Sequence, residues 1–197
     1  MSRSRYNDIA PYYDAAFRPL QRWFLAHLRE KTFSLLPKKA RLLEVGAGTG
    51  LNFVLYSPDT CAVATEPSSE MLKIAKDKKR PKDVRLVQAC AESLPFDDDS
   101  FDAALATLVF CSLASPHRAF VELQRVVRTG GTILLLEHVR PNGVLGPIFD
   151  LLNRITVPLC DDHFNRRPVD EARAAGLELL RVEESLMGIM NIIACRV

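Results

Sequence analysis

The strongest chemical signal in this chain is the segment Glu-Val-Gly-Ala-Gly-Thr-Gly at residues 44–50, which continues an apolar run. Its glycines alternate with other residues: Gly46, Gly48 and Gly50. Glycine takes positive φ and admits a ligand close to the backbone, because it has no Cβ. The turn is expected to open into a helix over residues 49–56, whose free N–H groups favour an anionic group. A second apolar run ends on Glu66, a carboxylate suited to accept hydrogen bonds from ribose hydroxyls. Together these residues predict a nucleotide-binding site.

The spacing of the glycines also bears on which nucleotide is bound. A dinucleotide-binding Gly-x-Gly-x-x-Gly pattern would place its third glycine at position 51, where this chain has Leu51. This difference argues against NAD or FAD and favours S-adenosylmethionine (SAM). A nucleotide-binding oxidoreductase stays as an alternative, although no constellation for hydride transfer accompanies the motif.

Apolar runs and turn residues predict the elements that must position these side chains. Strands are expected at residues 40–45, 60–65, 84–90, 101–107 and 132–139, and helices at residues 19–36, 49–56, 68–78 and 116–127. Ser68 is a typical N-cap, and the glycines at residues 130–131 are expected to end a helix. Alternating strands and helices favour an α/β fold with a parallel sheet covered on both faces. Ligands in such folds bind at the carboxyl ends of the strands.

The C-terminal tail shows a different pattern. A helix is expected at residues 168–175, followed by strands at residues 177–184 and 188–197. The short connection between these two strands leaves no room for a parallel crossover, so they are expected to pair antiparallel.

Composition narrows the class of protein. The 197 residues fit one domain, and a net charge of +2 with 25% charged residues gives no reason to expect nucleic acid as a partner. The five cysteines are odd in number and include no Cys-x-x-Cys pair, which favours a reduced protein over a disulfide framework or a zinc site. No signal peptide or membrane-spanning run is visible, so a cytoplasmic location is expected.

Four segments in this order carry a family resemblance: residues 44–50, 66–72, 91–96 and 122–131. They resemble the motifs of class I SAM-dependent methyltransferases. The resemblance implies a Rossmann-like three-layer sandwich with a seven-stranded, mostly parallel sheet whose last strand is antiparallel. It is greatest for the branch that holds quinone-biosynthesis C-methyltransferases, phosphatidylethanolamine N-methyltransferases and thiol methyltransferases. Residues 107–113 and 137–139 are similar to the last two groups in particular.

The resemblance implies a cofactor-binding set: Glu44, Gly46, Ala47, Gly48, Gly50, Asn52, Glu66, Pro67, Met71, Ala91, Glu92, Thr107 and Leu108. Glu44 and the glycine turn would serve the amino-acid end of SAM, Glu66 the ribose, and residues 91–92 the adenine edge. Thr107 and Leu108 would lie beside the methyl-bearing sulfur. The chain departs from the family at Cys90, where an acidic residue usually accepts from the adenine amino group. A thiol is a weak acceptor, so Glu92, backbone or water would have to supply that contact.

Methyl transfer requires few catalytic residues, because the sulfonium is already activated. A base is needed only if the acceptor must lose a proton. His138 follows the apolar run at residues 132–137 and is expected at the carboxyl edge of the sheet, near the substrate; the alternative is a structural histidine that anchors the strand end. Tyr6 and Tyr13 resemble the family's N-terminal segment that folds over SAM; the alternative is simple packing of a helix on the sheet.

One further cluster is weaker as a signal. His163 follows Asp161 and Asp162, a combination that suits either a cation site or an exposed loop. The loop is favoured, and no metal is expected.

The chain is expected to divide into an N-terminal helical cap at residues 1–36 and a methyltransferase domain at residues 37–197. Residues 140–167 form a substrate-side insert in this division. Within the insert, residues 144–159 have one apolar helical face. This face suits a lid that holds an apolar acceptor or makes weak peripheral contact with a membrane; packing against the domain or a second subunit is the alternative.

The sequence therefore predicts a SAM-dependent methyltransferase with a small or lipid-like acceptor and S-adenosylhomocysteine as the product. A SAM-binding protein without transfer activity is the alternative from another class. Among enzymes, the open alternatives are C-methylation of a quinone precursor, N-methylation of a phospholipid and S-methylation of a thiol. The pattern gives no oligomeric state.

Overall fold

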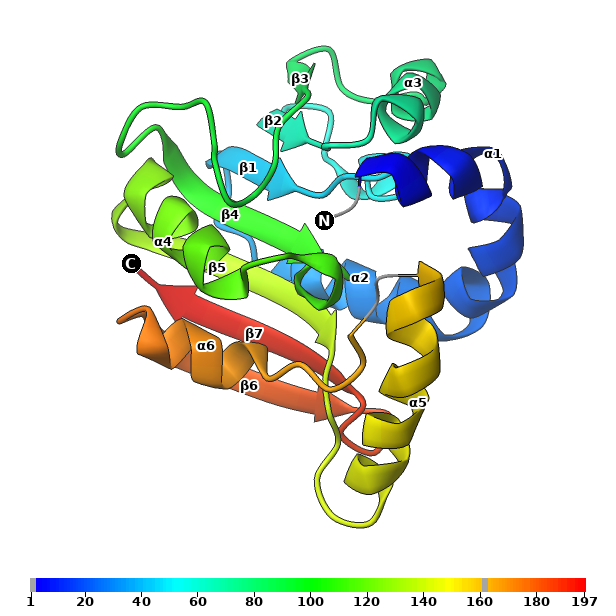
Figure 1. The fold of residues 1–197 in the computed structure, drawn as a ribbon. Coiled ribbons are helices and arrows are strands. Elements are labelled where there is room, and N and C mark those ends of the chain that lie inside the picture. Colours follow the sequence, from blue (N-terminus) through cyan, green and yellow to red (C-terminus); the bar gives the residue numbers. More distant parts are fainter. Residues whose placement is uncertain (1–2, 161–162) are drawn as a thin grey trace.

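The structure is a computed structural model that describes residues 3–160 and 163–197. A seven-stranded sheet with the order β3-β2-β1-β4-β5-β7-β6 forms its centre (Figure 1). The strands are β1 (Arg41–Val45), β2 (Cys61–Thr65), β3 (Val84–Val87), β4 (Phe101–Thr107), β5 (Val127–His138), β6 (Glu178–Ser185) and β7 (Met190–Arg196). The first five strands are parallel, and β7 runs antiparallel to both β5 and β6. The predicted fold class is confirmed, including the antiparallel last strand.

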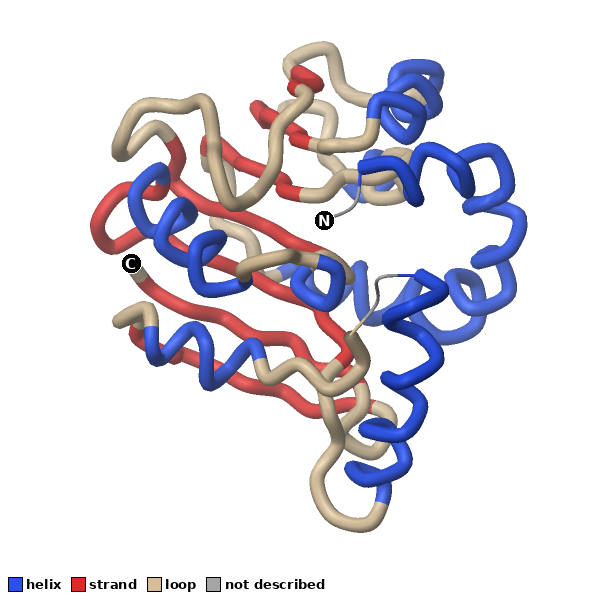
Figure 2. The backbone as a smooth tube through the Cα atoms, in the orientation of Figure 1, coloured by secondary structure: helices blue, strands red, loops and turns tan. Residues whose placement is uncertain are grey.

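Helices cover both faces of this sheet. They are α1 (Arg3–Leu20), α2 (Ala26–Ser34), α3 (Ser69–Asp77), α4 (Pro116–Val126), α5 (Leu145–Cys160) and α6 (Pro168–Ala174). Short helical turns are η1 (Gln21–Leu25), η2 (Phe53–Leu55) and η3 (Phe110–Ser112). Figure 2 shows α4 and α6 on one face of the sheet and α2 on the opposite face. Helix α1 lies instead at the edge where the parallel strands end.

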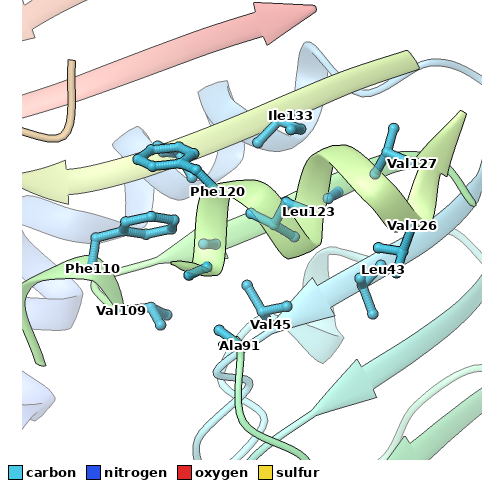
Figure 3. Packing of buried hydrophobic residues seen from close by; sticks show 14 of the residues in the cluster. Leu43, Val45, Ala91, Val109, Phe110, Phe120, Leu123, Val126, Val127 and Ile133 are labelled. Carbon is cyan, nitrogen blue, oxygen red and sulfur yellow. The ribbon is translucent and has the colours of Figure 1, made fainter. Parts of the chain in front are cut away.

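Alternate side chains of the central strands point to opposite faces of the sheet and pack against the helices there, because a strand has a side-chain period of two. On the α4 side, Leu43 and Ile133 pack with Phe120 and Leu123 in one apolar cluster (Figure 3). On the opposite side, Leu42, Leu105 and Leu134 belong to a second cluster that Phe33 and Leu35 contact. Central strands are thus buried on both faces, which explains their continuous apolar runs.

The N-terminal helix differs from the prediction. A helix was expected over residues 19–36, but helical structure begins at Arg3 and continues through Pro19. Pro19 cannot donate the hydrogen bond of its turn. Helix α1 ends at Leu20, and the π-helical turn η1 carries the chain from Gln21 to Leu25 before α2 continues.

The expected helix at residues 49–56 is also wrong. Residues 49–52 form turns, and only the 3₁₀ turn η2 follows. Gly50 has a φ of +81°, which no helix accommodates. The side chains of Asn52 and Tyr56 both donate to the Glu44 carboxylate, so tertiary hydrogen bonds fix this segment in a non-helical path.

The glycines at residues 130–131 do not end a helix. Helix α4 ends at Val126 and β5 begins at the next residue, so both glycines lie inside that strand. The pairing with β4 shifts register there, and a Cβ on Gly131 would lie 2.8 Å from the carbonyl oxygen of Asp102. Glycine is therefore required by close backbone packing at an irregular strand. Strand β3 is also shorter than expected and ends at Val87.

The remaining elements agree with the sequence. Ser68 caps α3 by accepting from the N–H of Met71, and β4 has the expected bounds. No helix in the described part of the chain is long and apolar enough to cross a membrane. Cytoplasmic location and membrane contact stay predictions.

Candidate functional site

A small cavity of about 50 Å³ lies where β1, β2 and β4 end. It brings together many of the predicted cofactor-binding residues: Gly46, Ala47, Gly48, Glu66, Met71, Thr107 and Leu108. Tyr6 and Tyr13 of α1 close its other side. Residues from five separate elements and loops therefore converge at the carboxyl edge of the parallel strands, as an open α/β sheet favours.

The glycine turn forms one wall of this cavity. A Cβ on Gly46 would lie 2.5 Å from a methyl carbon of Val109, so this glycine allows two loops to pack closely. Gly48 has a φ of +57°, and a Cβ there would meet no atom within 4 Å. The open space beside Gly48 and its place in the cavity wall leave room for a ligand against the backbone.

Glu66 sits at the end of β2 and is almost completely buried. Its carboxylate accepts from the N–H of Gly48 at 3.0 Å and from the N–H of Ser68 at 2.8 Å. A carboxylate has about four lone-pair sites, so both oxygens retain capacity for ligand hydroxyls. Burial raises the pKa of the Glu66 carboxyl to about 7, while the two N–H groups act in the opposite direction.

A buried polar network lies beneath the glycine turn. Glu44 is fully buried and accepts from Asn52 Nδ2 at 2.6 Å and from the Tyr56 hydroxyl. Asn52 also donates to Thr107 Oγ1 at 3.0 Å, which links the turn to the end of β4. Burial raises the pKa of Glu44, although these hydrogen bonds oppose the shift. Neither Glu44 nor Asn52 lines the cavity, so their structural contribution is to hold the turn.

Four other predicted residues lie outside the wall of the small cavity. A Cβ on Gly50 would collide with the Phe53 ring, and Ala91 packs in the apolar cluster beneath α4. Glu92 accepts from the N–H of Ala114, and the carbonyl of Pro67 accepts from Gln88. Their assignment to the cofactor stays a prediction.

Side-chain hydrogen bonds hold helix α1 over this cavity. Ser68 Oγ donates to Asn7 Oδ1 at 2.6 Å, which joins the beginning of α1 to the N-terminus of α3. Further along, Asp14 accepts from Thr49 Oγ1 and from Lys78 Nζ, each at 2.6 Å. The helix therefore contacts both the glycine turn and the end of α3.

A second cavity, of about 600 Å³, adjoins the first. The two share Tyr6, Tyr13 and Leu108 in their walls. Leu108 has a φ of 58°, a left-handed conformation that is unusual for leucine and tends to occur at functional sites. Its N–H donates to the carbonyl of Leu136, and the Glu137 carboxylate accepts from the next N–H, that of Val109.

His138 lines the larger cavity and is absent from the wall of the smaller one. Its ring stacks on Phe164, with centroids 4.3 Å apart and planes inclined by 16°. His138 is therefore fixed at the end of β5, where the sequence predicted it. Within the described residues no group of His, Cys, Asp and Glu is arranged for a metal, and Asp161 and Asp162 lie outside them.

Comparisons with known proteins agree with this geometry. Residues 43–135 match the family model described as a methyltransferase domain. A phosphatidylethanolamine N-methyltransferase from Cereibacter sphaeroides is 31% identical over 156 residues, 72% of this chain and 77% of that protein. The ubiquinone/menaquinone biosynthesis C-methyltransferase UbiE of Syntrophotalea carbinolica is 32% identical over 168 residues, 80% and 70% of the two chains. The chain belongs to the SAM-dependent methyltransferases.

A solved structure extends the similarity over nearly the whole methyltransferase. A SAM-dependent methyltransferase from Thermotoga maritima, described as a possible histamine N-methyltransferase, superposes with a TM-score of 0.70 at 25% identity. The match covers 95% of this chain and 97% of that one. The family predicted from the motifs is thereby confirmed, and SAM is the cofactor of the methyltransferase.

The residues at hand fit this cofactor. An open backbone cradle at Gly48, a buried carboxylate at Glu66 and the apolar side chains of Met71 and Leu108 suit a nucleoside joined to a sulfonium. Sequence analysis missed Arg29 of α2, which lines the same cavity and donates to Asn52 and to Thr107 Oγ1. Its guanidinium lies close enough to the Glu44 and Glu137 carboxylates to interact with them, so it adds a charge-compensated group to this wall.

The raised pKa of Glu66 leads to a pH prediction for the methyltransferase. The family resemblance implies that Glu66 holds the ribose hydroxyls, which donate best to the ionised carboxylate, so SAM affinity is expected to fall as the pH falls below about 7. The dissociation constant is expected to rise about tenfold between pH 8 and pH 6, since one pH unit below the pKa leaves roughly a tenth of the carboxyl ionised. Calorimetric titration with SAM measures this. Glu66→Gln should bind weakly with a flat profile; an equally steep profile in that variant would assign the titration to another group.

Proposed function

We propose that this methyltransferase transfers the methyl group of SAM to a small-molecule acceptor held in the larger cavity. The observation that carries this proposal is the shared wall of the two cavities, formed by Tyr6, Tyr13 and Leu108. A methyl group held beside Leu108 would face the larger cavity, and in-line transfer requires donor and nucleophile to meet in that manner.

On the cofactor side, we assign each residue a role that its position supports. Glu66 binds the ribose hydroxyls, and the turn at Gly48 lies against the amino-acid portion. Glu44 and Asn52 hold the turn in place from below. When bound, SAM supplies a methyl group already activated on a sulfonium, so the protein's task is alignment and exclusion of water.

On the acceptor side, His138 is the candidate for accepting a proton from the nucleophile. It lies at the end of β5 in the larger cavity, and stacking on Phe164 fixes the plane of its ring. A thiol, a hydroxyl or an activated ring carbon loses a proton on methylation, and general-base assistance is typically provided by a positioned histidine. Thiols, phospholipids and quinone precursors are all retained as acceptor classes under this proposal. A SAM-binding protein without transfer is retained as the alternative.

In this proposal the catalytic domain comprises residues 37–197 and includes a substrate-side insert at residues 140–167. The cap over the site comprises residues 1–36. The cap is supported by the hydrogen bonds of Asn7 and Asp14 to the rim of the small cavity. That cavity, about 50 Å³, is far below the roughly 300–1,000 Å³ of ordinary ligand pockets. Helix α1 therefore moves aside when a nucleoside binds and closes again to exclude water.

The experiment is a turnover assay with a panel of acceptors. Purified protein is incubated with SAM and thiols, phenols, hydroquinones, amines and phospholipids, and S-adenosylhomocysteine release is measured. We expect saturable release with one acceptor class. Tight SAM binding with no release above the acceptor-free background for any class would favour the alternative without transfer.

Substitution of His138 tests its role once an acceptor is known. His138→Ala is expected to lower kcat roughly 100-fold, the scale of general-base catalysis, with SAM affinity unchanged because His138 is outside the small cavity. His138→Phe preserves an aromatic ring against Phe164 and should be equally slow. His117→Ala is the matched control, since His117 is exposed on α4. A normal kcat in His138→Phe would contradict a role in proton transfer and would show that His138 contributes only packing.

A further inference from the structure

The described residues that line the larger cavity carry no formal charge apart from the titratable imidazole of His138. Of the described residues that line it, none is Asp, Glu, Lys or Arg. The polar groups among them are neutral hydroxyls and a thiol, from Tyr12, Thr156 and Cys111 for example, together with the imidazole of His138. A bound ion would therefore find no counter-charge on these side chains.

The apolar surface continues from the floor of this cavity to its rim. Leu25 and Met190 are almost fully buried in the floor, whereas Ile9 and Leu20 are 41% and 43% exposed at the rim. Phe24, more than half exposed, continues the same surface outward. A cavity of about 600 Å³ has the volume of an ordinary small-molecule pocket.

We propose that the larger cavity selects uncharged, apolar methyl acceptors and rejects acceptors with a charged group near the nucleophile, the phosphate of a phospholipid headgroup included. The proposal rests on the proposed function, because it specifies the acceptor of that site. The nucleophile must reach Leu108, so any charge close to it is buried with it. Burial of an unpaired ion is costly, whereas burial of each methylene is favourable. Phospholipid methylation, the activity in the name of one relative, is therefore disfavoured for this chain.

Binding of three ten-carbon probes to the protein alone tests the proposal by calorimetry, without SAM. The probes are 1,10-decanediol, decanedioate and 1,10-diaminodecane at pH 7.5. Each carries the same group at both ends, so a bound chain cannot leave its only charge in solvent. We expect the diol to bind at least tenfold more tightly than either charged probe. Shortening the diol to 1,8-octanediol removes two methylenes and should weaken binding roughly fifteenfold, because each methylene contributes roughly fourfold.

A pair of neighbouring variants locates the binding site. Ala15 and Ala16 are both exposed on α1, but only Ala16 lines the larger cavity. Ala16→Trp should fill the cavity and weaken diol binding at least tenfold, whereas Ala15→Trp should leave it unchanged. Circular dichroism confirms that both variants are folded.

Three outcomes would overturn the proposal: a charged probe that binds as tightly as the diol, a diol that does not bind, or equal binding by both tryptophan variants. None of these depends on methyl transfer. Failure of the proposed function would instead appear as SAM binding without turnover, so the two failures are distinguishable.

Discussion

Gly48→Val is expected to abolish SAM binding, with a dissociation constant raised more than about 100-fold. A Cβ at this position meets no protein atom within 4 Å, and the proposed function places SAM in that space. Valine would place three carbon atoms there and displace the amino-acid portion of SAM from the turn amides. Calorimetric titration with SAM measures the effect.

Gly143→Val is the control for the backbone strain that Gly48→Val introduces. Gly143 has a φ of +66°, close to the +57° of Gly48, and a Cβ there also meets nothing within 4 Å. Gly143 lies in the loop before α5 and outside both cavities. Gly143→Val should lose similar stability, about 1–2 kcal/mol, but retain SAM affinity. If both variants bind SAM normally, the glycine turn is not the cofactor site.

Removal of residues 1–14 is expected to lower turnover at least about 100-fold while the domain stays folded. These residues supply Tyr6 and Tyr13 to both cavities and Asp14 to the rim. Their loss would expose the reacting groups to water and misalign them, an effect of this order in closed active sites. Ala10 is the one buried apolar residue described in this segment, and the three apolar clusters among the described residues include none before Leu25, so those clusters are retained.

Thermal unfolding separates the two effects of this truncation. The midpoint should fall by no more than about 5 °C, since about 1 kcal/mol corresponds to 2–4 °C in a domain of this size. Asp14→Asn serves as a milder variant that weakens the contact with Lys78 and should slow turnover without a change in midpoint. Full activity in the truncated protein would contradict the cap. A collapse in stability would instead make residues 1–14 part of the core.

Local signals in the sequence predicted much of this fold. Ser68 caps α3 because its hydroxyl and the helix N–H groups are neighbours in sequence, and the continuous apolar run of β4 reflects burial on both faces. Such local signals could not predict the backbone path of residues 49–56. It depends on hydrogen bonds between Asn52, Tyr56 and the buried Glu44, which only the folded chain brings together.

The same distinction applies to the candidate site. Glu66 was identifiable because a carboxylate at the end of a strand after a glycine turn has a recognisable spacing. Arg29 had no such signal, since its partner Thr107 is far away in sequence and Arg29 looks like any charge on a helix. The left-handed backbone of Leu108 could not be predicted from the sequence either. Hydrogen bonds from the N–H groups of Leu108 and Val109 to residues of β5 fix this conformation.

A crystal structure with S-adenosylhomocysteine would show whether the two cavities form one methyl-transfer site. We expect the ribose hydroxyls on Glu66, the amino-acid portion against Gly48 and the sulfur beside Leu108, facing the cavity that His138 lines. A sulfur directed away from that cavity, or a ribose without contact to Glu66, would contradict this expectation.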